Sequence, residues 1–212
     1  MEIGIKARRG RPTGQSDVLT SDEIQRLLGA VKDRRTTEGA RDFAVLLMLA
    51  NTPARKGELV ALNLENVKAQ GGAYSISRRA LKKKKTVWIT TPISAEAYAG
   101  IIAYVRKWNL DPAKDAQGPL FFTLGGRGGY ERRRLTPKAV DCLVEKYARR
   151  AGITKRITPH SFRATYLTLR SAGHKPETLA TLSGHASLAS ILPYLRSTDE
   201  ERRSAALAVA FA

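Results

Sequence analysis

One stretch of this chain departs from a pattern that repeats along most of its length. Elsewhere, apolar residues recur three and four positions apart, which is the spacing of one face of an α-helix. Residues 71–92 instead alternate between apolar and polar side chains on both sides of four consecutive lysines. Alternation is typical of strands, and a charged run between two alternating segments indicates a hairpin turn. The sequence therefore predicts a mainly α fold with one small antiparallel β-sheet, an α+β class.

Capping residues, glycines and prolines mark the expected helix boundaries. Thr20 or Ser21 can cap the first helix, Pro53 ends the second, and Ser94 can cap the helix after the hairpin. Residues 118–137 are predicted to form a short extended segment followed by a glycine-rich loop. The predicted helices span residues 19–33, 38–53, 56–64, 94–110, 137–152, 160–173, 175–184, 187–197 and 199–212.

Charge limits the partners that this chain can have. The 37 Lys and Arg residues against 19 Asp and Glu leave a formal net charge of +18. This excess repels itself unless an anion takes up the field, so nucleic acid is the first expected partner and an anionic membrane surface the second. No apolar run reaches the roughly 18 residues that span a bilayer, and residues 1–17 lack the apolar core of a signal peptide. We expect a cytosolic protein.

Metal and disulfide chemistry have little support in the sequence. Cys142 is the single cysteine, so no internal disulfide can form. The three histidines are scattered, without carboxylate or thiol companions at ligand spacing. We expect a reduced compartment, no structural metal and no cofactor.

Two basic features in the first half of the chain have ordinary explanations when each is taken alone. Arg55 lies just beyond an apolar helix and three residues before Glu58, where a solvated surface charge is common. The lysine run 82–85 suits a solubilising or DNA-contacting turn. Neither feature indicates catalysis by itself.

The second half holds three more candidates that are equally ordinary in isolation. His160 and Arg163, in the segment HSFR, share one face at the start of a helix. His185 precedes another predicted helix, where a lone histidine is usually structural. Tyr194 lies among small and apolar residues, where packing is the usual role.

The order of these features resembles the catalytic domain of the tyrosine recombinases, the family of phage integrases and Xer-type resolvases. NTPARKGEL resembles the first arginine box, HSFR the second, and LSGHASLASILPY the final segment that ends in the nucleophile. The similarity runs from about Leu19 to about Ala208. It implies a site-specific recombinase whose catalytic residues are Arg55, Lys84, His160, Arg163, His185 and Tyr194, with Glu58 in a supporting role.

The resemblance implies phosphoryl transfer without metal or ATP. The tyrosine phenolate attacks a DNA phosphodiester, forms a 3′-phosphotyrosyl bond and expels a 5′-hydroxyl, and a 5′-hydroxyl from another strand reverses the step. Arg55 and Arg163 would grip two non-bridging oxygens. His160 would exchange a proton with the tyrosine or donate to the phosphate, His185 would donate to a non-bridging oxygen, and the lysine would protonate the leaving oxygen.

Two positions depart from the family pattern, and the lysine is ambiguous. Thr52-Pro53-Ala54 precedes Arg55 where the family usually has Thr-Gly and a variable residue, so the local turn is expected to differ. Ala164 stands where histidine is common. Counting back from Pro92, which resembles the proline ending the third strand of the family, favours Lys84. A one-residue change in the hairpin would instead select Lys82, Lys83 or Lys85.

The remaining positive charge is expected to line a DNA-facing concavity. It gathers in RRALKKKK, GGRGGYERRRLTPK and KYARRAGITKR, where Lys and Arg would contact phosphates and supply salt-dependent affinity. The expected partner is a double-stranded DNA recombination site. The residues expected to bind it are Arg78, Arg79, Lys82, Lys83, Lys85, Arg127, Arg132, Arg133 and Arg134.

The chain is expected to hold one catalytic domain. Residues 1–17 are predicted to form a flexible basic tail or linker, and residues 18–212 the domain, without the core-binding domain of most relatives. Either the domain is excised from a longer chain, or this is a short recombinase similar to the fimbrial-switch invertases. The final apolar helix resembles one that relatives exchange between subunits, so we expect a tetramer on DNA and a monomer in free solution.

Two other functions stay open. A relaxing topoisomerase uses a related set of residues and would nick and reseal supercoiled DNA without sequence preference. A non-catalytic DNA-binding regulator would share the fold and bind DNA without cleaving it.

Overall fold

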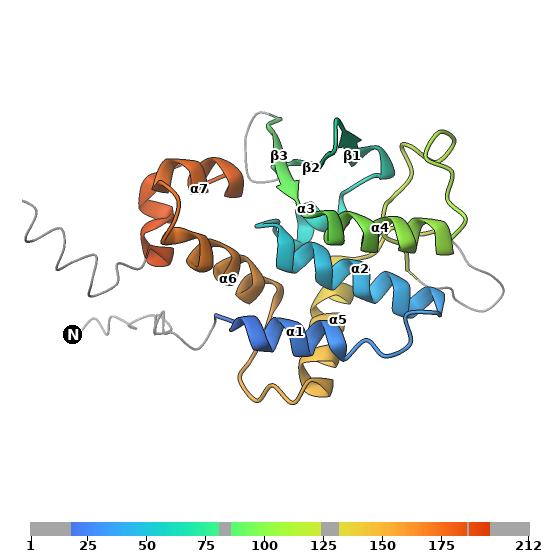
Figure 1. The fold of residues 1–212 in the computed structure, drawn as a ribbon, viewed down its shortest axis with the longest axis horizontal. Coiled ribbons are helices and arrows are strands. Elements are labelled where there is room, and N and C mark those ends of the chain that lie inside the picture. The colour runs from blue at the N-terminus through green and yellow to red at the C-terminus, as the bar shows by residue number, and fades with distance from the viewer. Residues whose placement is uncertain (1–17, 81–85, 124–131, 186, 196–212) are drawn as a thin grey trace, which may run out of the picture.

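The computed structural model describes residues 18–80, 86–123, 132–185 and 187–195, and the structural statements below concern that part of the chain. It is mostly helical with one three-stranded antiparallel sheet (Figure 1), which confirms the predicted fold class. The tail predicted over residues 1–17 and the helix predicted over residues 199–212 lie outside the described residues. The helices are α1 Ser21–Gly29, α2 Thr37–Asn51, α3 Lys56–Val60, α4 Ala95–Lys107, α5 Pro137–Arg150, α6 Pro159–Ser171 and α7 Pro176–Ser183.

Side-chain caps begin several helices at the predicted places. Thr20, not Ser21, caps α1: its hydroxyl accepts a hydrogen bond from the Glu23 N–H at 3.2 Å, and the Glu23 carboxylate accepts one from the Thr20 N–H at 2.8 Å. Ser94 caps α4 by accepting from the Ala97 N–H. Each such cap contributes about 1 kcal/mol, because it satisfies a backbone donor that the helix itself leaves unpaired.

Helix α2 is the centre of the main core. It is buried on nearly all sides between Gly39 and Leu49, which explains its wide apolar face in the sequence. Around it pack α1, α4, α5 and α6, as Figure 1 shows. Thr52 ends α2 in an extended conformation, and the chain then enters α3. The start of α3, where Arg55 lies, is therefore anchored to the most buried helix of the fold.

The sheet has one strand more than the sequence predicted. Strand β1 Val67–Gln70 pairs with β2 Ala73–Arg79, and β2 pairs with β3 Trp88–Ile93, all antiparallel. The sequence pattern missed β1, which is four residues long and largely exposed. Gly71 and Gly72, both with positive φ, form the turn between β1 and β2. The predicted hairpin between β2 and β3 is confirmed, and its lysines at 82–85 lie outside the described residues.

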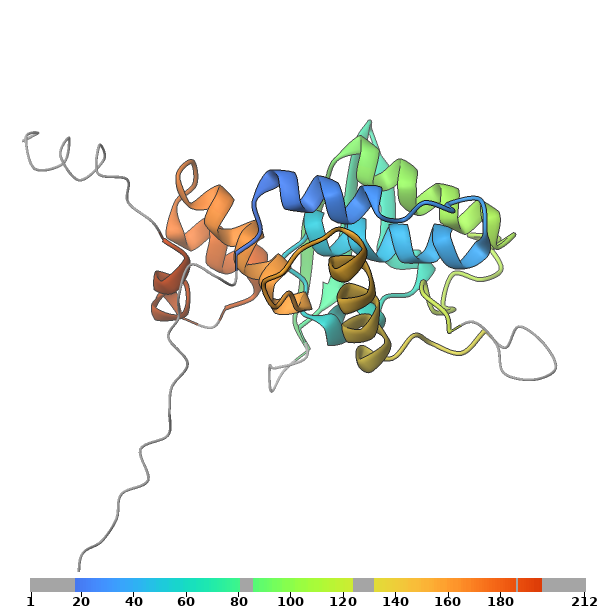
Figure 2. The same cartoon turned by 90° about the horizontal axis from the view of Figure 1, so that it is seen from below.

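A second, smaller apolar cluster lies at one end of the molecule. Its buried residues come from α6, α7 and the segment after α7: Tyr166, Leu167, Leu179, Ala180 and Ile191. Figures 1 and 2 show α7 set apart from the body formed by α1, α2, α4 and α5, with α6 leading to it. Because α7 also contacts β3, this small cluster is held between α6 and the sheet.

The prediction of a continuous helix over residues 187–197 is wrong. The chain instead forms two single 3₁₀ turns, η3 Leu188–Ser190 and η4 Leu192–Tyr194. Pro193 lies inside this stretch, and proline removes a backbone donor and clashes with the preceding turn of an α-helix. The apolar residues of this segment therefore do not share one buried face: Ile191 is fully buried, whereas Leu188 and Leu192 are 44% and 61% exposed.

Residues 118–123 form the predicted extended segment, with isolated bridges from Asn63 to Pro119 and from Phe122 to Arg134. Within the described ranges, no helix is long and apolar enough to cross a membrane. The same residues hold no group of three or more His, Cys, Asp or Glu side chains arranged as metal ligands.

Candidate active site

The first arginine box begins a short helix organised by one buried carboxylate. Arg55 is the extended residue before α3, and the Glu58 side chain on that helix is 0% exposed. Glu58 Oε2 accepts a hydrogen bond from the Arg55 N–H at 3.1 Å, and Oε1 accepts one from Arg55 Nη1 at 2.8 Å. The carboxylate therefore holds both the backbone and the guanidinium of Arg55, which is the position of a supporting residue.

Arg78 lies inside this site and not on a DNA-facing surface, so its predicted surface position is wrong. Its side chain on β2 is 1% exposed, and its Nε lies 3.4 Å from Glu58 Oε2. Nη2 donates to the backbone carbonyl of Leu182 on α7. Burial lowers the pKa of Arg78, and the nearby Glu58 carboxylate opposes that effect. Arg78 thus connects α3, the sheet and α7 behind the exposed part of the site.

Arg163, on α6, is held by backbone carbonyls from two other segments. Nη1 donates to the Pro53 carbonyl, and Nη2 donates to the Ser183 carbonyl at 2.8 Å. Pro53 lies between α2 and α3, where the flanking Thr52 and Arg55 are both extended. The segment that departs from the family pattern therefore supplies an acceptor for the second arginine. Arg163 is 2% exposed, so most of its guanidinium is already committed to the protein.

His185 follows α7 and contacts the guanidinium of Arg163. Gly184 ends α7 in the left-handed conformation, with φ of 68°, and a Cβ at this position would clash with Ile89 of β3. This turn brings His185 Nε2 to 3.1 Å from Arg163 Nη2. The other ring nitrogen, Nδ1, lies 2.7 Å from the hydroxyl of Ser183.

Tyr194 packs and also faces the site. Its partly buried side chain contacts the small cluster that includes Ile191 and Leu179. Its ring stacks on that of His185, with centroids 6.1 Å apart and planes 26° apart. Tyr194 is also close enough to Arg163 to offset a small part of the lowering of the pKa of that guanidinium. The tyrosine thus occupies the position at which the packed cluster meets the basic residues.

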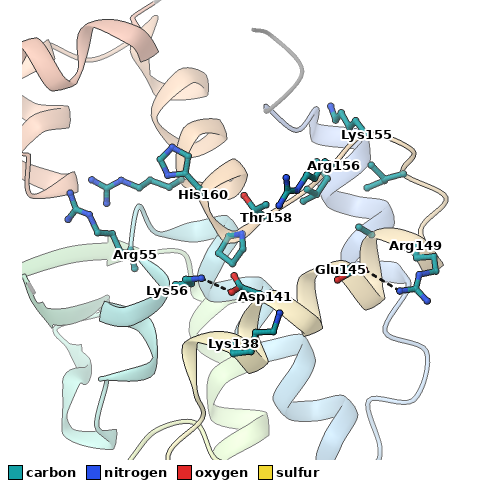
Figure 3. A pocket seen from close by; sticks show the side chains of 16 residues that line it. Arg55, Lys56, Lys138, Asp141, Glu145, Arg149, Lys155, Arg156, Thr158 and His160 are labelled. Carbon is teal, nitrogen blue, oxygen red and sulfur yellow. Dashed lines mark hydrogen bonds and ion pairs between the residues drawn. The ribbon is translucent and has the colours of Figure 1, made fainter. Parts of the chain in front are cut away.

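An open cavity of about 790 Å³ runs from these arginines along α5. In Figure 3, Arg55 and His160 lie at one end, and Lys155 and Arg156 lie at the other. Two acids also line it, Asp141, paired with Lys56 at 2.5 Å, and Glu145. The basic lining residues are Arg55, Lys56, Lys138, Arg149, Lys155, Arg156, His160 and Arg163.

Burial and mutual repulsion shift the pKa values of two groups in the site. The pKa of Arg163 falls to about 10, chiefly because burial removes water from the guanidinium, and then because Arg55 and Arg78 are nearby. The pKa of His185 falls to about 4, again through burial first and then through Arg163 and Arg55. At neutral pH the arginine is therefore charged and the histidine is neutral.

The shifted histidine predicts a dependence of stability on pH. In the unfolded chain His185 has its ordinary pKa of 6.5, so below that pH the unfolded state binds a proton that the folded state binds only near pH 4. The free energy of unfolding is therefore expected to fall as pH drops from about 6.5 toward 4.

Thermal unfolding midpoints measured at pH 7, 6 and 5 test this dependence. His185→Gln is expected to reduce the slope, and His174→Gln, which changes an exposed histidine, is expected to leave it unchanged. No measurement is made below pH 5, because the pKa values of Glu23 and Glu38 are lowered from 4.5 and these carboxylates contribute in the same direction at more acidic pH. Equal slopes in the wild type and both variants would exclude the assignment to His185.

The other predicted DNA-binding residues fall into separate groups. Arg79 is exposed on β2 opposite Trp88. Arg132 forms an ion pair with Asp115 at 2.7 Å, and Arg133 is also exposed. The guanidinium of Arg134 is engaged in the fold, because it donates to the carbonyls of Val60 and Leu62 and to Asn63 Oδ1. Outside the described residues lie Lys82, Lys83, Lys84, Lys85 and Arg127.

Sequence reasoning missed two parts of the site. One is the backbone carbonyl of Pro53, which no side-chain pattern can indicate. The other is Ser183, fully buried at the end of α7, whose signal would have been a hydroxyl two residues before a candidate histidine. The predicted Arg55, Arg163, His185 and Tyr194 are brought together with Glu58, and His160 lines the same cavity as the two arginines.

Comparison with known proteins identifies the family of this chain. The model of the phage integrase family matches residues 17–201. This chain belongs to the phage integrase family. The tyrosine recombinase XerD of Caulobacter vibrioides is 31% identical to it over 196 residues, which cover 91% of this chain and 61% of XerD. Integrase-family relatives were expected from the ordered motifs, and that expectation is confirmed.

Solved structures of the same family share the fold. The crystal structure of XerA recombinase matches with a TM-score of 0.69 and 26% identity, covering 89% of this chain and 63% of XerA. The XerH site-specific recombinase bound to palindromic difH substrate, in a post-cleavage complex, matches with a TM-score of 0.69 and 21% identity, covering 91% and 52%. The chain thus spans about three-fifths of the curated relatives that it matches.

Proposed function

We propose that this chain is the catalytic part of a site-specific DNA recombinase, which cleaves and rejoins strands through a 3′-phosphotyrosyl intermediate. The observation that carries the proposal is the meeting of Arg55, Arg163, His185 and Tyr194 beside one open basic cavity. The chain belongs to the phage integrase family, and the similar XerH protein is described as a site-specific recombinase bound to its difH substrate. Residues 18–212 are proposed as the catalytic domain.

The charge balance of the site suits a phosphodiester. Three guanidinium groups, those of Arg55, Arg78 and Arg163, face one carboxylate, Glu58, so two positive charges are left unbalanced. His185 adds no charge at neutral pH, because its pKa is about 4. A phosphoryl group under attack gains negative charge on its non-bridging oxygens. Fixed guanidinium groups stabilise that charge without first having to reorganise.

The bond changes balance without an external energy source. The phenolate oxygen of Tyr194 bonds to phosphorus while the bond from phosphorus to the 5′-oxygen breaks, and the 5′-oxygen takes up a proton. Lys84 stays the proposed donor of that proton, with Lys82, Lys83 and Lys85 as its alternatives. Attack by another 5′-hydroxyl on the phosphotyrosyl bond then releases Tyr194 and joins the new strand.

DNA is proposed to follow the basic cavity. Lys138, Arg149, Lys155 and Arg156 extend the positive lining beyond Arg55 and His160. A duplex whose scissile phosphate lies at the arginines would place neighbouring phosphates near these side chains, and affinity would then depend on salt. Assembly into a tetramer on DNA by exchange of the final helix, from a monomer in free solution, is proposed on the sequence pattern of residues 199–212 alone.

A suicide substrate tests the function. A nicked duplex carrying the recombination site, which loses the 5′-hydroxyl fragment after cleavage, is expected to trap a covalent adduct that survives denaturing electrophoresis. The site would come from the repeats that flank the open reading frame in its genome. DNA of unrelated sequence is the matched control. An adduct with the cognate site alone supports site-specific recombination.

Two other outcomes would replace the proposal with its rivals. Relaxation of any supercoiled plasmid, without preference for the site, would favour a topoisomerase. DNA binding with no adduct on any substrate, by a chain whose folding is verified by circular dichroism, would favour a non-catalytic DNA-binding module.

A further inference from the structure

Ser183 is a buried polar residue that contacts the site and that the proposed reaction leaves unused. Its side chain is fully buried at the end of α7, two residues before His185. Its hydroxyl lies 2.7 Å from His185 Nδ1, 2.6 Å from the Leu179 carbonyl and 3.2 Å from the Ala180 carbonyl. A hydroxyl has one proton to donate, and a carbonyl can only accept. When that proton goes to one of the backbone carbonyls, the serine oxygen remains as an acceptor for the histidine.

The other side of the imidazole leads to the same tautomer. Arg163 Nη2 lies 3.1 Å from His185 Nε2, and a guanidinium has only N–H donors. Nε2 must therefore accept, which places the proton of the neutral ring on Nδ1, where Ser183 receives it. The low pKa of His185 is consistent with a neutral ring, because burial, Arg163 and Arg55 each lower this pKa by more than Glu58 raises it.

We propose that Ser183 is a positioning residue, which holds His185 in the Nδ1–H tautomer and through it fixes the direction of the Arg163 guanidinium. The hydrogen bonds run in one direction, from Arg163 to His185, from His185 to Ser183, and from Ser183 to the backbone of α7. His185 thus presents an acceptor toward Arg163 before DNA binds. The donor role that the family resemblance implies for His185 is not available from Nε2 in this arrangement.

The consequence for the reaction rests on the proposed function. Arg163 keeps its contacts with the Pro53 and Ser183 carbonyls when the serine hydroxyl is removed, so its side chain stays in the site. The loss of the hydrogen bond between His185 and Ser183, of about 1 kcal/mol, is expected to slow strand cleavage about fivefold to tenfold. DNA affinity is expected to change less than twofold, because Ser183 is buried and does not line the cavity.

The tautomer is read directly by nitrogen NMR of the free protein labelled with ¹⁵N-histidine. The chain has three histidines, so His185 is assigned by the signal missing from His185→Gln. At pH 7 the wild type is expected to show a neutral ring protonated on Nδ1. A ring protonated on Nε2, or on both nitrogens, would overturn the proposal whether or not the protein cleaves DNA.

Two variants test the role of the hydroxyl. Ser183→Ala is expected to lose the single tautomer and to cleave the suicide substrate about fivefold to tenfold more slowly at saturating DNA. Ser183→Cys fills the same space with a weak acceptor, and it is expected to follow Ser183→Ala even if the cavity left by alanine destabilises the fold. A wild-type tautomer and cleavage rate in either folded variant would overturn the proposal.

Thr181→Ala is the matched control on the same helix. The Thr181 hydroxyl donates to the Glu177 carbonyl, as the Ser183 hydroxyl does to Leu179, but Thr181 is exposed. Its removal is expected to change neither the tautomer of His185 nor the cleavage rate. An equal effect of both alanine substitutions would assign the loss to weakening of α7 and would contradict the positioning role.

Discussion

Replacement of Tyr194 by phenylalanine is expected to abolish the covalent protein–DNA adduct while the protein still folds and binds DNA. The phenolic oxygen is the atom that bonds to phosphorus in the proposed reaction, and phenylalanine has no atom to replace it. The ring keeps its contacts with the small cluster and with His185. The measurement is denaturing electrophoresis of the labelled suicide substrate, with DNA binding followed in parallel by native gel shift.

Tyr74→Phe is the control for this change. The Tyr74 ring stacks on Tyr98 at 4.3 Å between centroids, on the sheet side of the fold and away from the small cluster. Loss of its hydroxyl is expected to leave adduct formation at the wild-type level. An adduct that persists in Tyr194→Phe would assign the nucleophile to another residue.

Glu58→Gln is expected to lower the free energy of unfolding more than the other substitutions that we propose. The substitution keeps the shape of the side chain but removes the negative charge that lies between Arg55 and the buried Arg78. Removing one partner of a buried ion pair typically costs about 3–5 kcal/mol, because the other charge stays buried without compensation. Urea unfolding at pH 7 is expected to show this decrease in the free energy of unfolding.

Glu145→Gln provides the comparison for a carboxylate at the surface. Glu145 pairs with Arg149 at 3.5 Å, and both side chains are largely exposed. Exposed pairs of this spacing on a helix contribute about 0.3–0.5 kcal/mol. If Glu58→Gln costs no more than Glu145→Gln, the buried network is not the structural centre of the site that we describe.

The candidate residues of the site could be predicted from the order of the motifs along the chain, but the contacts between these residues could not. Arg55, Arg163, His185 and Tyr194 come from four segments, and only packing brings those segments together. The tautomer of His185 depends on a serine hydroxyl and a guanidinium whose positions no spacing rule encodes. The same holds for the Pro53 carbonyl, which is a backbone acceptor and has no signature in the sequence.

At Arg78 two sequence patterns gave opposite predictions, and the wrong one was followed. Arg78 shares the strand face of the buried residues Ile76 and Ala80, so alternation alone places it toward the interior. Its position in a run of basic residues indicated the opposite. The structure resolves the conflict by burying the guanidinium beside Glu58, which a strand pattern cannot predict.

The errors in secondary structure have equally local causes. β1 is too short and too exposed to show alternation, and it forms because β2 offers it an edge with which to pair. The prediction of a helix over residues 187–197 gave too little weight to Pro193, because four apolar residues at helical spacing favoured a helix: Leu188, Ile191, Leu192 and Leu195. Tyr194 consequently lies on a 3₁₀ turn and not on an α-helix.

Because the apolar interior is divided into two clusters, the two parts of the proposed active site can differ in local stability. Arg55 and Glu58 are anchored by the main core around α2, whereas His185 and Tyr194 depend on a cluster with five buried residues in the described part of the chain. A small cooperative unit of this kind opens at a lower free energy than the body to which it is attached. Two of the proposed catalytic residues, His185 and Tyr194, can therefore separate from the others while the rest of the molecule stays native, and we expect opening of this small cluster alone to interrupt the proposed reaction.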